Sequence, residues 1–343
     1  MHKIIEQEVQ EIVFEFKDFL NSLEGKTVLI TGGSGSIASY LVDIFERFNC
    51  KLIILEKNEI TSESRLSHLI GHPNVKFICQ DVGKPFSLPS NINIIIHAAS
   101  RANLKAFLED PLDTIDANIN ATRTLLEYAR ENPVENFIFF SSAEIYGNPV
   151  KEFIPTPETY TGNIDCLHPA SCYTESKRLS ETLCSIFFRK YNVPVKILRP
   201  LLCYGPGMKN DGKVISDFYV AGKNNKEINL RDRGEDTRSF CYISDAVKGI
   251  LMVMFKGNSG EAYNLGSDKE NISILGLAHE IAGVLNNGAL VKPNLDTLPK
   301  QIYGVPTRNV DISKLRKLGF EPKVSLREGL NKLKEYVEEV GWG

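Results

Sequence analysis

A short apolar strand, a glycine turn and a helix follow one another between residues 26 and 48. The strand is expected at Thr27–Thr31, the turn has the spacing Gly32-x-x-Gly35-x-x-Ala38, and the helix is expected at Ser39–Phe48. Residues without side chains let a pyrophosphate lie against backbone N–H groups and the positive end of the helix. The order therefore predicts a dinucleotide site, in which the turn contacts the phosphates through Gly32, Gly35, Ser36 and Ile37.

Strands and helices alternate from this turn as far as residue 199. Such alternation predicts an α/β fold with a doubly wound parallel sheet of the Rossmann type. With 343 residues, 42% of them apolar, the chain is long enough for one large α/β domain and a smaller companion. The further strands are expected at Lys51–Glu56, Val75–Gln80, Ile92–His97, Asn136–Ser141 and Val195–Leu198, and the main helices between strands at Leu112–Glu131 and Ser176–Lys190.

Three segments are expected along the chain. Residues 1–24 form an amphipathic helix, residues 25–200 the dinucleotide-binding domain, and residues 201–343 mainly a smaller substrate lobe that returns in part to the first domain. Helices are expected in this lobe at Ile274–Leu285 and Leu326–Val340. The N-terminal helix is expected to dock on its own domain instead of a partner subunit, through Ile5, Val9, Ile12, Phe16, Phe19 and Leu23 at helical spacing.

Charge and cysteine content exclude several classes of function. The net charge of −3 provides no basic surface, so neither nucleic acid nor an anionic membrane is expected as a partner. Seven cysteines without a C-x-x-C pair or a secretory leader favour reduced thiols in the cytoplasm. The histidines lack H-x-x-x-H and H-E-x-x-H spacing, so no metal site is expected.

Polar or small residues follow the second, third and fourth strands. Glu56 ends the second strand, where a carboxylate accepts hydrogen bonds from the adenosine ribose and repels a 2′-phosphate, which favours NAD over NADP. The alternative is a charged strand terminus, and the neighbouring Lys57 weakens the discrimination. The other residues expected at the cofactor, from the carboxyl ends of the next two strands, are Asp81, Val82, Ala98 and Ala99.

Tyr173 and Lys177 lie four residues apart at the start of a helix. Residues at this spacing share a helix face, so the ammonium can lower the phenol pKa while it holds a cofactor ribose. The phenol then acts as a general base on a sugar hydroxyl during hydride transfer, with Ser142 as the third hydrogen-bonding member. A lone Tyr-x-x-x-Lys usually marks a helix surface. Together with the glycine turn and the serine at a strand end, it predicts catalysis.

These residues resemble the extended short-chain dehydrogenase/reductase family, whose members remodel the sugar of nucleotide-sugars. Within it the chain is most similar to UDP-glucuronate decarboxylases, at residues 172–178, 204–208, 210–216, 237–245 and 311–314. The resemblance implies a retained NAD, oxidation of the sugar C4 hydroxyl, and chemistry on a 4-keto intermediate before the hydride returns. It also implies that Arg238 holds the substrate pyrophosphate, that Arg308 assists at the nucleotide, and that two long helices pair across a homodimer.

The sequence leaves the reaction open. The decarboxylases carry Thr-Ser-Glu where this chain has Ser142, Ala143 and Glu144, an Arg at Gly207 and an Asn at Leu202. Sugar-nucleotide 4,6-dehydratases use an Asp acid at the position of Ala143, and epimerases generally lack the carboxylate of Glu144. Decarboxylation tolerates Ala143 best and is the first hypothesis, with 4,6-dehydration and 4-epimerisation as alternatives.

Two further interpretations concern charge and turnover. A positive field for a substrate carboxylate is expected from Arg101 or Lys105, unless both are solvated helix charges. The last alternative is a non-catalytic NAD-sensing protein of the same fold. The presence of Ser142, Tyr173 and Lys177 together argues against it.

Overall fold

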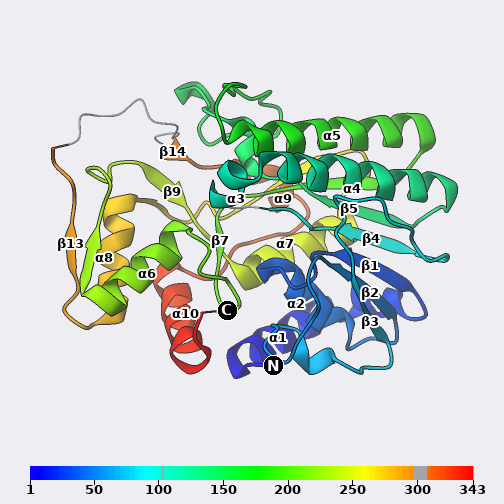
Figure 1. Ribbon diagram of the computed structural model, residues 1–343, viewed down its shortest axis with the longest axis horizontal. Helices are drawn as coiled ribbons and strands as arrows, with labels where there is room; N and C mark the ends of the chain where they lie inside the picture. The colour runs from blue at the N-terminus through cyan, green and yellow to red at the C-terminus, as the bar shows by residue number, and fades with distance from the viewer. Residues whose placement is uncertain (102–103, 297–306, 343) are drawn as a thin grey trace.

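Seven parallel strands form the central sheet in the order β11-β6-β5-β4-β1-β2-β3 (Figure 1). The computed structural model describes residues 1–101, 104–296 and 307–342. The strand order reverses between β1 and β4, which is the point where open α/β sheets bind ligands beyond the carboxyl ends of their strands. The strands are β1 (Thr27–Thr31), β2 (Lys51–Glu56), β3 (Val75–Cys79), β4 (Ile94–His97), β5 (Asn136–Phe140), β6 (Val195–Pro200) and β11 (Ala262–Leu265). The predicted doubly wound parallel sheet is confirmed.

Helices cover both faces of this sheet, as its buried strands require. On one face α4 (Pro111–Glu131) and α5 (Ser171–Tyr191) lie side by side, and on the other lie α1 (Lys3–Leu20), α2 (Ser36–Phe45) and α7 (Ile243–Lys256) (Figure 1). Alternate residues of β1 point into the two hydrophobic cores, one on each face of the sheet. Leu29 packs in the core under α4, whereas Val28 and Ile30 pack in the core shared with α2.

Two helix starts differ from those expected by three residues or more, whereas α4 begins only one residue early, at Pro111. Helix α2 begins at Ser36 and ends at Phe45, because Gly35 is its N-cap and the helix starts directly on the glycine turn. Helix α5 begins at Ser171, five residues before the expected start. Tyr173 therefore lies in its first turn. The expected ends of β3 and β5 are each one residue too long, and the expected start of β4 is two residues too early. Periodicity locates an element better than its ends.

The N-terminal helix α1 docks on its own chain, as predicted. Ile5, Val9, Ile12 and Phe16 are buried against the α2 and α7 side of the sheet. Leu23 is buried just beyond, in the 3₁₀ turn η1 (Asn21–Leu23). Phe19 stays 36% exposed, and its ring stacks on that of Phe255 at 5.4 Å between centroids.

The C-terminal half forms small sheets and helices beside the main sheet (Figure 1). Its helices α8 and α10 have the predicted bounds. Two elements, α7 and β11, return to the large sheet. The remaining elements are β7 (Cys203–Tyr204), α6 (Val214–Asn225), β8 (Glu227–Asn229), β9 (Thr237–Ser239), β10 (Cys241–Tyr242), β12 (Asn271–Ser273), α8 (Ile274–Leu285), β13 (Leu290–Lys292), β14 (Thr307–Arg308), α9 (Ser313–Arg316) and α10 (Leu326–Val340).

Candidate active site

The glycine turn packs directly against the loop that follows β4. Gly32 has φ +67°, and a Cβ added there would lie 2.7 Å from Ala99 Cα and 2.9 Å from Ala99 N. A side chain is excluded on both grounds. The turn therefore brings Gly32, Ala98 and Ala99 together at the carboxyl ends of β1 and β4.

The N-terminus of α2 has no capping side chain. Its N-cap is Gly35, whose own N–H donates to Gly32 O at 3.0 Å and whose carbonyl accepts from Ser39 N at 2.9 Å. The amides of Ser36 and Ile37, in the first turn, have no side-chain cap of the kind that satisfies most helix starts. A pyrophosphate fits this end of the helix.

Glu56 lies against the same turn. Its carboxylate accepts hydrogen bonds from Ser34 N at 2.5 Å and Ser34 Oγ at 2.8 Å, and only 9% of the residue is exposed. Burial raises the pKa of Glu56, and the two hydrogen bonds from Ser34 oppose that rise. The acidic end of β2 thus lies beside the glycine turn, close to where a carboxylate binds the ribose in dinucleotide-binding folds.

Asp81 and Val82 follow the neighbouring strand β3. Asp81 Oδ2 pairs with Lys57 Nζ at 2.8 Å, and Asp81 Oδ1 accepts from Gly83 N at 3.0 Å. Val82 is buried in the core. Hence Lys57, which weakened the cofactor prediction, is ion-paired with a residue from the next strand end.

Tyr173 and Lys177 lie one turn apart on α5, and both are buried. The Tyr173 ring stacks on Phe107 at 4.6 Å between centroids. Burial raises the pKa of Tyr173 to about 12, a hydrogen bond with Ser142 opposes this, and the negative charge of Glu144 adds to it. The structure thus brings the predicted serine and tyrosine together.

Lys177 does not lower the phenol pKa here, contrary to the expectation. Its ammonium donates to Phe140 O at 2.7 Å, at the end of β5, and burial lowers its pKa to about 7. Burial disfavours the charged form of an amine and of a phenol alike. Burial therefore dominates both pKa values in this structure.

A buried chain of hydrogen bonds beneath the site was not predicted. His97 Nδ1 lies 2.7 Å from Thr31 Oγ1, and His97 Nε2 lies 3.1 Å from Thr122 Oγ1. The Thr122 hydroxyl donates to Asn118 O at 2.5 Å, so it accepts from His97 Nε2–H. Burial lowers the pKa of His97 to about 3, and the charge of Lys177 adds to the effect. The polar residue at the end of an otherwise apolar strand was the available signal.

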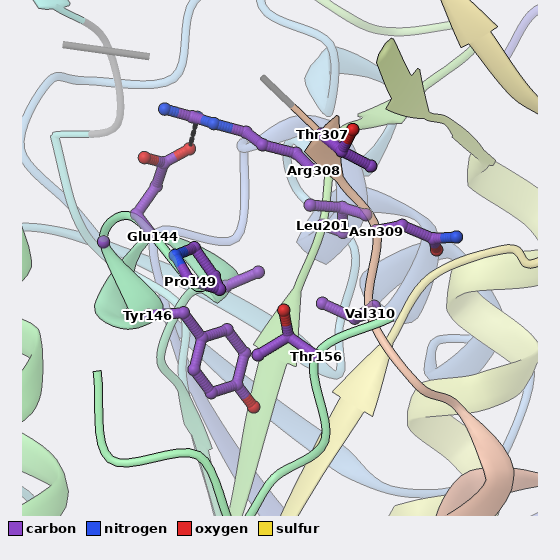
Figure 2. A pocket seen from close by; sticks show the side chains of 11 residues that line it. Glu144, Tyr146, Pro149, Thr156, Leu201, Thr307, Arg308, Asn309 and Val310 are labelled. Atoms are coloured by element: carbon purple, nitrogen blue, oxygen red, sulfur yellow. Dashed lines mark hydrogen bonds and ion pairs between the residues drawn. The ribbon is translucent and has the colours of Figure 1, made fainter. Parts of the chain in front are cut away.

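The side chains of Glu144 and Arg308 both line one pocket and point toward each other (Figure 2). Glu144 belongs to the 3₁₀ turn η3 (Ala143–Tyr146), directly after Ser142, and Arg308 belongs to β14. Their side chains form an ion pair. The pocket is lined by Ala143, Glu144, Tyr146, Gly147, Pro149, Thr156, Leu201, Thr307, Arg308, Asn309 and Val310.

Arg238 is the cross-strand neighbour of Arg308. In the parallel pair of β9 and β14 the two arginines are register partners. Burial lowers the pKa of Arg238, and the charge of Arg308 lowers it further. Arg238 is also ion-paired with Asp236 at 3.2 Å, so each of the two guanidinium groups has a carboxylate partner. A guanidinium group remains suited to an anionic ligand that displaces such a partner.

Arg101 and Lys105 are the other two cations that the sequence places near the site. Arg101 pairs with Asp110 at 3.3 Å and with Asp113 at 2.8 Å, whereas the side chain of Lys105 lies outside the described residues. Within the described ranges no three metal-ligating side chains come together. The same ranges contain no helix with the length and apolar character needed to span a bilayer.

Comparison with known proteins identifies the family. A model described as the NAD dependent epimerase/dehydratase family matches residues 28–266. UDP-glucuronic acid decarboxylase 3 of Arabidopsis thaliana is 34% identical over 320 residues, which cover 90% of this chain and 88% of that protein. UDP-glucuronic acid decarboxylase 1 of Xenopus tropicalis is 32% identical and covers 94% of this chain and 74% of its own.

A solved structure extends the similarity to the fold. UDP-glucose 4-epimerase from Thermotoga maritima, solved with UDP-glucose, is 28% identical with a TM-score of 0.77, and the match covers 91% of this chain and 99% of that one. The family match, the relatives and the sheet order agree with the resemblance inferred from the motifs. The chain belongs to the NAD-dependent epimerase/dehydratase family of enzymes.

Proposed function

We propose that this enzyme oxidises the C4 hydroxyl of UDP-glucuronate and decarboxylates the resulting 4-keto sugar. One observation carries the proposal: Tyr173, hydrogen-bonded to Ser142, lies next to a carboxylate that is paired with an arginine. The relatives named UDP-glucuronic acid decarboxylase support this choice of substrate, because they match nearly the whole chain.

The cofactor residues follow from the geometry of the glycine turn. We assign binding of the pyrophosphate to Gly32, Gly35, Ser36 and Ile37, and binding of the adenosine to Glu56, Asp81 and Val82. Ala98 and Ala99, in the loop after β4, are assigned to contact with the cofactor. Bound NAD supplies an acceptor for the C4 hydride and later returns it. The uncapped start of α2 and the position of Glu56 beside Ser34 support these assignments.

Tyr173 takes the proton of the C4 hydroxyl in this proposal, and Ser142 hydrogen-bonds the same oxygen. With a pKa of about 12, the phenol is a poor base until positive charge enters the cleft. Lys177 supplies that charge if its ammonium stays protonated, which contact with the cofactor ribose favours. The site residues are thus positioned for oxidation.

The step after oxidation distinguishes the candidate reactions. In decarboxylation the bond from C5 to the carboxylate breaks, carbon dioxide leaves, and the electron pair moves into the 4-ketone as an enolate, which is then protonated at C5. No acid is needed at C6, so Ala143 is tolerated. Arg238 is assigned to the pyrophosphate. The ion pair with Glu144 supports a position for Arg308 beside the reacting sugar, closer to the chemistry than the nucleotide role first expected.

Mass spectrometry of the products tests the proposal directly. UDP-glucuronate is incubated with the enzyme and NAD, and a product lighter by carbon dioxide is the expected result. Loss of water from a nucleotide hexose identifies a 4,6-dehydratase instead. A product of unchanged mass identifies a 4-epimerase, the activity named for the Thermotoga maritima structure. No product and no reduction of the cofactor with any nucleotide-sugar indicate a sensor.

A homodimer is proposed through the outer faces of α4 and α5. Leu125 and Leu126 of α4 are buried in the chain's own core. The outward residues Leu112, Leu179 and Ile186 are instead 72%, 46% and 39% exposed. Light scattering during gel filtration tests the mass, with Leu179→Glu/Ile186→Glu expected to give monomers.

We propose a cytoplasmic location and a division of the chain into three segments. Each of the seven cysteines is a free thiol, which supports a reducing, cytoplasmic location. The division into residues 1–24, 25–200 and 201–343 is supported by the docked helix α1 and by the return of α7 and β11 to the large sheet.

A further inference from the structure

A chain of ion pairs crosses the strand ends next to Glu56. Asp113, in the first turn of α4, accepts from Lys57 Nζ at 3.0 Å and from Arg101 Nη2 at 2.8 Å through the same oxygen, Oδ2. Lys57 is held on its other side by Asp81 Oδ2 at 2.8 Å. One carboxylate of α4 therefore fixes two cations that come from the loops after β2 and β4.

Lys57 occupies a sensitive position. It directly follows Glu56, the residue assigned to the adenosine ribose, and its side chain is 48% exposed. A free ammonium there would attract the extra phosphate of NADP and offset the repulsion from Glu56. Lys57 and Arg101, together with the carboxylates of Asp81, Asp110 and Asp113 that they contact, form a group with one net negative charge.

We propose that Asp113 is a specificity-determining residue that holds the Lys57 ammonium away from the adenosine ribose, so that the cleft selects NAD against NADP. This inference rests on the proposed assignment of Glu56 and Asp81 to the adenosine. It explains how a chain with a lysine after its ribose-binding carboxylate keeps a preference for NAD. The determinant lies on α4, outside the β2 segment that sequence arguments consult.

Asp113 also has a simpler use that the test must separate. An acidic residue in the first turn stabilises a helix by interacting with the positive end of the helix dipole, whether or not the residue also binds Lys57. That role predicts a loss of stability when Asp113 is neutralised, with an unchanged ratio of NADP to NAD. The proposed role predicts a changed ratio, and the change must depend on Lys57.

The experiment measures bound dinucleotides instead of activity. Purified enzyme is incubated with equal, saturating concentrations of NAD and NADP, freed of unbound nucleotide by gel filtration, and denatured, and both nucleotides are quantified by chromatography. Asp113→Asn is compared with the natural chain and with Asp116→Asn. The second variant neutralises an acid one turn further along α4, whose carboxylate accepts a hydrogen bond from Asn120 of the same helix. Asp113→Ser replaces Asp113→Asn if the latter does not fold.

The expected result is a rise of about fivefold to tenfold in the ratio of bound NADP to NAD for Asp113→Asn, the size of effect that one charge exerts at a partly exposed site. Asp113→Glu and Asp116→Asn should keep the natural ratio, and Lys57→Gln should abolish the rise in the Asp113→Asn background. An unchanged ratio with normal NAD binding overturns the role of Asp113 alone. If neither NAD nor NADP is bound by any variant or by the natural chain, the cofactor assignment is overturned as well.

Discussion

Glu144 and Arg308, 164 positions apart in the chain, both line one pocket and form an ion pair there. The pair joins the turn after β5 to β14, and so links the half that carries Tyr173 to the half that carries Arg238. Under the proposed function, a substrate carboxylate would compete with Glu144 for Arg308. The carboxylate of Glu144 is thus positioned to be released toward the sugar when an anionic ligand arrives.

Glu144→Gln should slow the step after C4 oxidation, because the amide cannot exchange a proton at the sugar. The expected loss in product formation is about 10²-fold, and reduced cofactor should accumulate during a single turnover. Absorbance at the reduced nicotinamide band measures the oxidation, and chromatography measures the product. If both fall together, Glu144 acts before oxidation or only structurally. Glu152→Gln, in the exposed turn η4 (Lys151–Phe153), is the matched control.

Tyr173→Phe should abolish turnover and leave NAD binding intact. The ring still stacks on Phe107, and only the hydroxyl that meets Ser142 is lost. Loss of a general base lowers the rate by about 10² to 10⁴-fold. The measurement pairs turnover with the NAD content of the purified variant. An undiminished rate would remove Tyr173 from the mechanism.

The sequence was sufficient to predict the sheet and most of the site because both depend on local patterns. The glycine turn, the strand ends and the Tyr-x-x-x-Lys helix each lie in a short stretch, and parallel topology brings such strand ends to one edge. Gly32 shows why: its conformation and its contact with Ala99 leave no room for a side chain. The fold therefore requires a glycine at that position, and the requirement can be recognised in the local sequence.

Long-range contacts and solvation were not predictable in the same way. The partner of Arg308 is Glu144, and nothing in either local sequence indicates the pair. The phenol pKa was expected to fall because of Lys177, but complete burial of both groups raises one pKa and lowers the other. Desolvation depends on everything packed around a group, and a motif does not contain that information.

Glu56→Ala should weaken NAD binding by about tenfold or more. The substitution removes the proposed ribose contact and also the two hydrogen bonds that hold Ser34 of the phosphate turn. Titration of cofactor-free protein with NAD gives the dissociation constant. Ser34→Ala separates the two effects, since it loses one hydrogen bond to the turn but keeps the carboxylate. Equal affinity for Glu56→Ala and the natural chain refutes the ribose role.

His97 should make the fold sensitive to acid. Its pKa is about 3 in the folded protein and about 6.5 when unfolded, so between these values the unfolded chain binds one more proton. Stability is then lost as the pH falls below about 6.5, by up to about 1.4 kcal/mol per pH unit from this residue. Above pH 6.5 both states are neutral at His97 and the contribution is constant.

The measurement is the free energy of unfolding by urea at several values between pH 5 and pH 7. His97→Gln, which does not titrate in this range, should be less stable than the natural chain at pH 7 because the bonds to Thr31 and Thr122 are disturbed, yet its stability should fall less steeply toward pH 5. His279→Gln, at an exposed site, should keep the natural slope. The same slope in His97→Gln as in the natural chain would show that the imidazole is protonated in the folded state, and the directional chain from Thr31 to Asn118 would then be wrong.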